Sequence, residues 1–216
     1  MDLKNKLYFT NIFIIDWDDT LFPTTWVNQN SINLSDEDSI KDYKLYFIEL
    51  DRTVSTFLEN LRKVGQIFIV TNANIKWIKA CIAVLTSTRK IIMEADIRIV
   101  SARDMYSSTS SSPTEWKIKT FKDILNSIVL RISDKLQCNM FLNIISLGDA
   151  NYEYAALISL DDYFKSNIKN INYLLKSIKF IEKPRFDIII DQIMTVKKNA
   201  EHIINKIGYI DLKFKD

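Results

Sequence analysis

The residues best suited to chemistry in this sequence are three aspartates that directly follow a short apolar run. The run is Ile12-Phe13-Ile14-Ile15, and the carboxylates are Asp16, Asp18 and Asp19. A run of this kind is typical of a strand that is buried on both faces. Because an unpaired buried carboxylate is costly, the cluster needs a cation or water beside it. The stretch therefore predicts a divalent metal at the carboxyl end of a parallel strand, with a solvated acidic turn after an edge strand as the alternative.

Polar side chains also follow two later apolar runs. Thr71 and Asn72 come at the end of one run, and Asp149 follows another, residues 141–147. In a parallel sheet the carboxyl ends of all strands lie at one edge. We therefore expect these side chains to lie close to the aspartates of the first run.

A lysine that could offset negative charge lies between these runs. Lys117 and Lys119 both follow a serine- and threonine-rich segment, residues 107–112, which we expect to be a loop, either regulatory or a plain connection. Carboxylates, a hydroxyl and an ammonium suit phosphoryl transfer, in which a metal and a lysine offset the phosphate charge while an aspartate attacks phosphorus. A site with oxygen ligands alone and few carboxylates favours Mg²⁺.

The elements that must position these groups alternate between strands and helices along the whole chain. This alternation predicts an α/β fold with a doubly wound, Rossmann-like parallel sheet of five strands and helices on both faces. No repeat or linker divides the chain, so we expect one domain over residues 1–216. The expected strands are 12–15, 66–72, 97–101, 141–147 and 175–181, and the expected helices include 36–63, 116–128 and a C-terminal helix at about 186–207.

Composition narrows the class of protein. Hydrophobic residues make up 47% and charged residues 26% of the chain, as is usual for a globular protein. A net charge of +2 gives no strong signal for nucleic-acid or membrane binding. Two cysteines, Cys81 and Cys138, are too few for a disulfide framework. Since Met1–Lys6 carries no signal-peptide pattern and no apolar run is long enough to span a membrane, we expect a soluble, cytoplasmic protein.

Four motifs occur in the order in which the haloacid dehalogenase (HAD) superfamily of phosphohydrolases has them, and the chain resembles that superfamily over about residues 11–160. The motifs are Asp16-x-Asp18-x-Thr20, Thr71, Lys117 or Lys119, and Gly148-Asp149-x-x-x-Glu153. The first and fourth are specific, whereas a lone threonine or lysine is weak. Glu153 stands where the superfamily commonly has an aspartate. We prefer Lys117 as the motif lysine because it directly follows the turn signal Ser112-Pro113-Thr114.

The resemblance implies a Mg²⁺-dependent phosphatase that works through an aspartyl-phosphate. Asp16 would be the nucleophile, and Asp18 would protonate the leaving oxygen and then activate water. The carboxylates of Asp16 and Asp149 and the backbone carbonyl of Asp18 would bind the metal. An aspartate at the second acidic position favours phosphatase chemistry over dehalogenase or ATPase chemistry within the superfamily.

The resemblance also implies roles for the other motif residues. Thr71 would bind a phosphoryl oxygen, and Lys117 would neutralise charge and orient Asp16. Glu153 would act from behind these groups, through water or by pairing with the lysine.

We further expect an open site with Thr20, Asn72 and Trp26 as substrate-binding residues. Capped members of the superfamily carry an inserted domain at positions that correspond to 21–34 or 104–115, and both segments are too short for one. Open sites in similar proteins go with bulky substrates, so the expected substrate is a phosphoprotein or a nucleic-acid end.

Every tryptophan lies beside a motif and could form an aromatic rim around the substrate, although packing in the core is the alternative. The alternative function is that of a catalytically silent HAD-fold protein that binds a protein partner.

Overall fold

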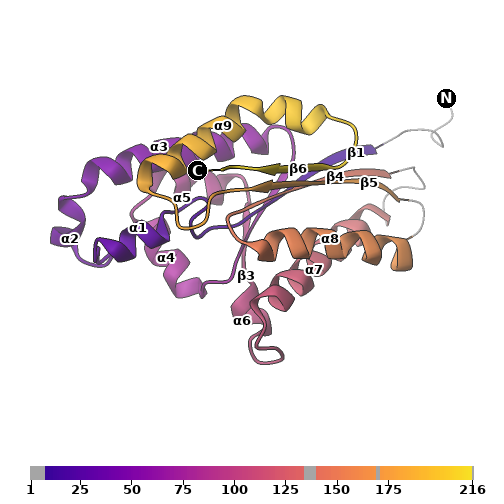
Figure 1. Cartoon of the computed structure of the whole chain (residues 1–216), viewed down its shortest axis with the longest axis horizontal. Coiled ribbons are helices and arrows are strands. Elements are labelled where there is room, and N and C mark those ends of the chain that lie inside the picture. The colour runs from indigo at the N-terminus through magenta and orange to yellow at the C-terminus, as the bar shows by residue number, and fades with distance from the viewer. Residues whose placement is uncertain (1–7, 134–139, 169–170, 216) are drawn as a thin grey trace.

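A six-stranded sheet, parallel throughout, forms the centre of the computed structural model, which describes residues 8–133, 140–168 and 171–215 (Figure 1). Met1–Lys6 and Cys138 therefore lie outside the described residues. The strands are β1 (Tyr8–Ile15), β2 (Gln66–Thr71), β3 (Arg98–Ser101), β4 (Met140–Gly148), β5 (Ile171–Lys179) and β6 (Ile210–Lys213).

The strand order is β3-β2-β1-β4-β5-β6, so the chain builds the sheet outwards from β1 in one direction and then from β4 in the other. This is the order of doubly wound sheets, and ligands bind such sheets where the order reverses, beyond the carboxyl ends of the central strands. The reversal here lies between β1 and β4, which pair from Tyr8↔Met140 to Ile15↔Leu147. The predicted α/β parallel sheet is confirmed, and its switch point lies at the carboxyl end of β1, directly before Asp16.

The predicted number of five strands is wrong, because the lysine-rich tail adds a sixth. β6 pairs with β5 from Lys176↔Ile210 to Lys179↔Lys213. Only Ile210 of its four residues is buried. Because the strand lies at the edge of the sheet, its sequence lacks the apolar run or alternation from which a strand is predicted. Gly208, at a φ of 113°, turns the chain from the last helix into the strand.

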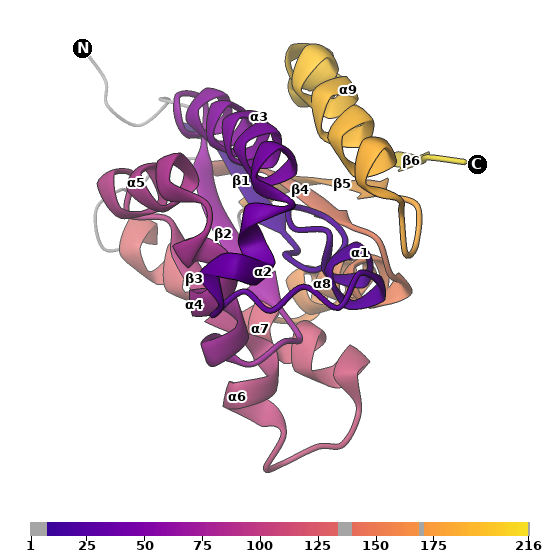
Figure 2. The same cartoon turned by 90° about the vertical axis from the view of Figure 1, so that its left-hand side faces the viewer.

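Helices cover both faces of the sheet, as the alternating side chains of β1 require. Phe13 and Ile15 face one core, and Ile12 and Ile14 face the other. Figures 1 and 2 show α3 and α9 over one face and α7 and α8 over the opposite face. The first core takes α3 (Lys44–Arg62), α4 (Ile75–Ala83), α5 (Thr86–Glu94) and α9 (Phe186–Asn205), and the second takes α6 (Ala102–Tyr106), α7 (Pro113–Ser133) and α8 (Asn151–Asn167).

The predicted helix over 36–63 is divided into α2 (Glu37–Lys41) and α3. Asp36 caps α2 by accepting a hydrogen bond from the Asp38 amide, and the helix ends after one turn, before Tyr43. The helix after β2 is likewise followed by a second one, α5. The amides of Ser87 and Thr88, in the first turn of α5, donate to the carboxylate of Asp51 in α3. A contact between residues so far apart in the chain cannot be predicted from a local sequence pattern.

The two segments that could carry an inserted domain hold only short elements in the described chain. α1 (Thr24–Gln29) and α2 lie between β1 and α3, and α6 with a short loop lies between β3 and α7. Among the described residues, no helix is both long and apolar enough to cross a membrane.

Candidate active site

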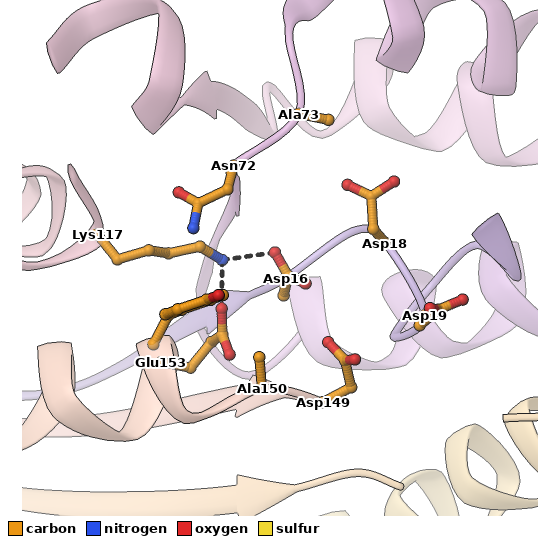
Figure 3. A pocket seen from close by; sticks show the side chains of 10 residues that line it. Asp16, Asp18, Asp19, Asn72, Ala73, Lys117, Asp149, Ala150 and Glu153 are labelled. Carbon is orange, nitrogen blue, oxygen red and sulfur yellow. Dashed lines mark hydrogen bonds and ion pairs between the residues drawn. The ribbon is translucent and has the colours of Figure 1, made fainter. Parts of the chain in front are cut away.

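A pocket of about 300 Å³ lies at the switch point between β1 and β4 (Figure 3). Six of the side chains predicted to form the site line it, contributed by the ends of three strands and the first turns of α7 and α8. The lining residues are Asp16, Asp18, Asp19, Asn72, Ala73, Lys117, Asp149, Ala150, Tyr152 and Glu153.

Lys117 is the central cation of the pocket, and its side chain is only 1% exposed. Its Nζ lies 2.5 Å from Asp16 Oδ1 and 2.5 Å from Glu153 Oε1, and it donates to the Val70 carbonyl at 2.7 Å (Figure 3). An ammonium has three donors, so all of them are used. Lys119 lies elsewhere, with its Nζ 5.6 Å from the centre of the Tyr106 ring. The geometry therefore brings Lys117 to the site and not Lys119.

The ion pair determines the charge states of its partners. Burial alone would lower the pKa of Lys117, but the charges of Asp16 and Glu153 hold that pKa above its ordinary value. Burial raises the pKa of Asp16 well above its usual range, and the neighbouring acids add to this while Lys117 opposes it. The lysine is thus a permanent cation beside the Asp16 carboxyl group, which is costly to ionise without a further positive charge.

Asp149 and Glu153 come from the turn between β4 and α8. Burial, together with the charges of Glu153 and Asp19, raises the pKa of Asp149 to about 7. Glu153 is 4% exposed, and within the described chain its Oε2 has no hydrogen-bond partner. Glu153 Oε2 can therefore still accept a hydrogen bond that no described side chain supplies.

Asp18 accepts hydrogen bonds from three neutral side chains. Thr24 Oγ1 and Trp77 Nε1 donate to its Oδ1 at 2.6 and 2.8 Å, and Thr71 Oγ1 donates to its Oδ2 at 2.9 Å. Figure 3 shows the Asp18 carboxylate turned away from Asp16, towards the side of the pocket where Ala73 lies. Its orientation is fixed by donors from α1, β2 and α4.

The residues predicted to bind substrate lie at different depths. Asn72 lines the pocket and donates from Nδ2 to the Pro113 carbonyl at 3.3 Å. Thr71 is fully buried behind it, donating to Asp18 and accepting from the Ala73 amide at 2.9 Å. Thr20 is also fully buried, and it is not among the residues that line the pocket in the described chain.

Trp26 was expected at the substrate rim, but the described structure has it outside the pocket lining, in an aromatic cluster. Its ring lies 5.5 Å from that of Tyr43 and 5.1 Å from that of Phe186. Trp116 donates to the Ser110 carbonyl, and Trp17 is buried in the core. Of the tryptophans beside the motifs, Trp77 is the one that donates to a site carboxylate.

The sequence analysis noted Asp19 in the acidic cluster and Trp77 beside a motif, but it included neither among the expected site residues. Asp19 has a φ of 51° and accepts from the amide and hydroxyl of Thr25, and burial raises its pKa. Its membership of the acidic stretch was the available signal. For Trp77 the signal was only its closeness to Thr71, because the direction of its indole depends on how Asn74 caps α4.

The oxygen atoms of the pocket are suitable ligands for Mg²⁺. Among the described residues, no three His, Cys, Asp or Glu side chains form a metal-binding group by themselves. A site made of the Asp16 and Asp149 carboxylates and the Asp18 backbone carbonyl would use two side chains, with water completing the shell as Mg²⁺ prefers. The unpartnered Glu153 Oε2 suits a hydrogen bond from such a water. Five carboxylates facing one ammonium also favour a further cation.

The chain matches no family model, and the comparisons with curated proteins and with solved structures find no match.

Proposed function

We propose that this chain is a Mg²⁺-dependent phosphatase of the haloacid dehalogenase type, with a Rossmann-like fold and no cap domain. The observation that carries the proposal is the buried ion pair of Lys117 and Asp16 at the switch point of the sheet. A carboxylate held by an ammonium at the bottom of an acidic pocket suits nucleophilic attack on a phosphoryl group whose charge the lysine offsets.

In the proposed reaction, Asp16 attacks phosphorus with the oxygen that does not contact Lys117. The ester bond breaks, and Asp18 gives a proton to the leaving oxygen. Asp18 then takes a proton from the water that attacks the aspartyl-phosphate, which releases inorganic phosphate and restores Asp16.

The metal would be held by the carboxylates of Asp16 and Asp149 and by the backbone carbonyl of Asp18. When bound, Mg²⁺ supplies positive charge for the phosphoryl oxygens and for the acids of the pocket. Glu153 fixes Lys117 from behind, which keeps the ammonium directed at Asp16.

The proposed substrate is a phosphorylated macromolecule, either a phosphoprotein or a nucleic-acid end. The short helices α1, α2 and α6 support this, since they leave the pocket open to a bulky group. Asn72 and Tyr152 line the pocket and are the candidates for contact with the group that carries the phosphate.

The test is phosphate release from an aryl phosphate by the wild type, Asp16→Asn and a control, Asp162→Asn. Asp162 is an exposed residue of α8, so its amide variant should retain full activity. We expect release with Mg²⁺, none with EDTA, and a loss of at least about 1000-fold in Asp16→Asn, because the nucleophile is removed.

An enzyme that needs a large substrate could ignore a small ester, so a binding measurement completes the test. Beryllofluoride imitates a phosphoryl group on a carboxylate, and it should raise the melting temperature only when Mg²⁺ is present and Asp16 is intact. An inactive wild type without this stabilisation would contradict the proposal and favour a catalytically silent binding protein.

A further inference from the structure

The two oxygens of Asp18 have different hydrogen-bond partners, and this difference has chemical consequences. Oδ1 accepts from Trp77 and Thr24, whereas Oδ2 accepts from Thr71 alone. A hydroxyl can turn and become an acceptor, but an indole N–H can only donate. Protonation of Oδ1 would leave the Trp77 N–H donating to a hydroxyl oxygen, which is a weaker acceptor than a carboxylate oxygen, even if the Thr24 hydroxyl turned to accept the proton. A proton on Oδ2 can be accepted by the Thr71 hydroxyl, and no donor of fixed direction is lost.

We propose that Trp77 is a positioning residue that keeps Asp18 Oδ1 an acceptor, so that Oδ2 is the atom that carries and transfers the proton. The inference rests on the proposed phosphatase reaction and adds to it a residue outside the motifs.

The indole is held firmly enough for this role. Its ring meets the ring of Phe22 edge-on, with the centres 6.1 Å apart and the planes at 86°, and Phe22 is fully buried. The Trp77 amide donates to Asn74 Oδ1 at 2.9 Å, which fixes the start of α4. A donor fixed on both its ring and its backbone can hold a carboxylate in a reactive orientation.

The proton and electron movements are balanced in both halves of the reaction. As the ester bond breaks, its electron pair goes to the leaving oxygen, which takes the proton from Oδ2. In the second half, Oδ2 takes a proton from water while the water oxygen bonds to phosphorus. The bond between phosphorus and Asp16 then breaks, and its electron pair returns to the carboxylate.

The choice of leaving group separates this role from simple packing. An alkoxide is a poor leaving group and needs the proton, whereas 4-nitrophenolate leaves without much help. Trp77→Phe retains a ring against Phe22 and loses only the N–H. We expect kcat/KM for an alkyl phosphate to fall about 10-fold or more and kcat/KM for 4-nitrophenyl phosphate to change by less than about twofold.

The matched control is Trp116→Phe, which also loses an indole hydrogen bond, to the Ser110 carbonyl at 2.7 Å. Its ratio of kcat/KM for the two esters should equal that of the wild type. A Trp77→Phe protein that loses activity on both esters to the same extent would overturn the positioning role alone.

A second measurement does not depend on turnover. In ¹H–¹⁵N spectra, Asp18→Asn should shift the indole N–H resonance of Trp77 and leave that of Trp116 in place. An unchanged Trp77 resonance would overturn the hydrogen bond and the role built on it. A wild type that hydrolyses neither ester and does not bind beryllofluoride with Mg²⁺ would overturn the proposed function, and the positioning role with it.

Discussion

Gly148 and Glu153 lie so close together that any side chain at position 148 would displace that of Glu153. A Cβ added to Gly148 would lie 2.3 Å from Cγ and 2.6 Å from Oε2 of Glu153. The glycine therefore gives Glu153 the space from which it contacts Lys117 at 2.5 Å. The last residue of β4 thereby controls the geometry of the ion pair.

The first prediction follows from this contact. Gly148→Ala should push Glu153 away from Lys117 and lower the proposed phosphatase activity at least about 10-fold, because Lys117 loses a contact that directs it at Asp16. Gly208→Ala is the control. Its φ of 113° would strain the backbone of an alanine, but an added Cβ would meet no atom within 4 Å. Both variants should melt at lower temperature, and only Gly148→Ala should lose activity per folded molecule.

Lys117→Met should destabilise the protein strongly. The substitution leaves Asp16 and Glu153 buried beside one another without a cation, and breaking a buried ion pair from one side costs about 3–5 kcal/mol. Urea unfolding would measure the loss. Lys119→Met, which removes only a contact with the Tyr106 ring, should have little effect, and equal losses in the two variants would contradict the assignment.

Asp149 should make the metal-free protein less stable as the pH rises. Its pKa is about 7 in the folded chain against an ordinary value of 3.8, so the folded state binds more protons between those values. The cost is absent below about pH 4 and complete above about pH 7.

In EDTA, Asp149→Asn should therefore be more stable than the wild type at pH 8 by about 1–2 kcal/mol, less than the full shift because water partly screens the side chain. The two proteins should be alike at pH 4. Addition of Mg²⁺ should stabilise the wild type and not the variant. A gain in stability that does not depend on pH would contradict this account.

Asp51 should matter for stability and not for activity. Its carboxylate accepts from the amides of Ser87 at 2.8 Å and Thr88 at 2.7 Å, and so caps α5 from a distant helix. Asp51→Ala should lower the free energy of unfolding by about 2 kcal/mol, because the buried amide of Thr88 and the partly buried amide of Ser87 lose their acceptor. Glu94→Ala, which removes an exposed ion pair with Lys90, is the control and should change stability little. A loss of activity per folded Asp51→Ala molecule would contradict a purely structural role.

The sequence by itself was enough to predict the central strands and the acids at their ends. The apolar runs before Asp16 and Asp149 predict strands buried on both faces, and parallel strands bring their carboxyl ends to one edge. That argument also predicted that Asn72 and Asp149 would lie close to Asp16 and Asp18, and the structure has all four in the lining of one pocket. These features depend on local burial and on chain direction, which a sequence records residue by residue.

Only the tertiary structure decided the features that depend on a distant partner. β6 is a strand because β5 offers it an unpaired edge, and α5 begins where Asp51 reaches it. The structure distinguishes Lys117 from Lys119, because of these two lysines only Lys117 contacts Asp16. It also shows that Trp77, in α4, donates to Asp18. A hydrogen bond or ion pair between residues far apart along the chain leaves no periodic trace, since its geometry arises only after the elements have packed.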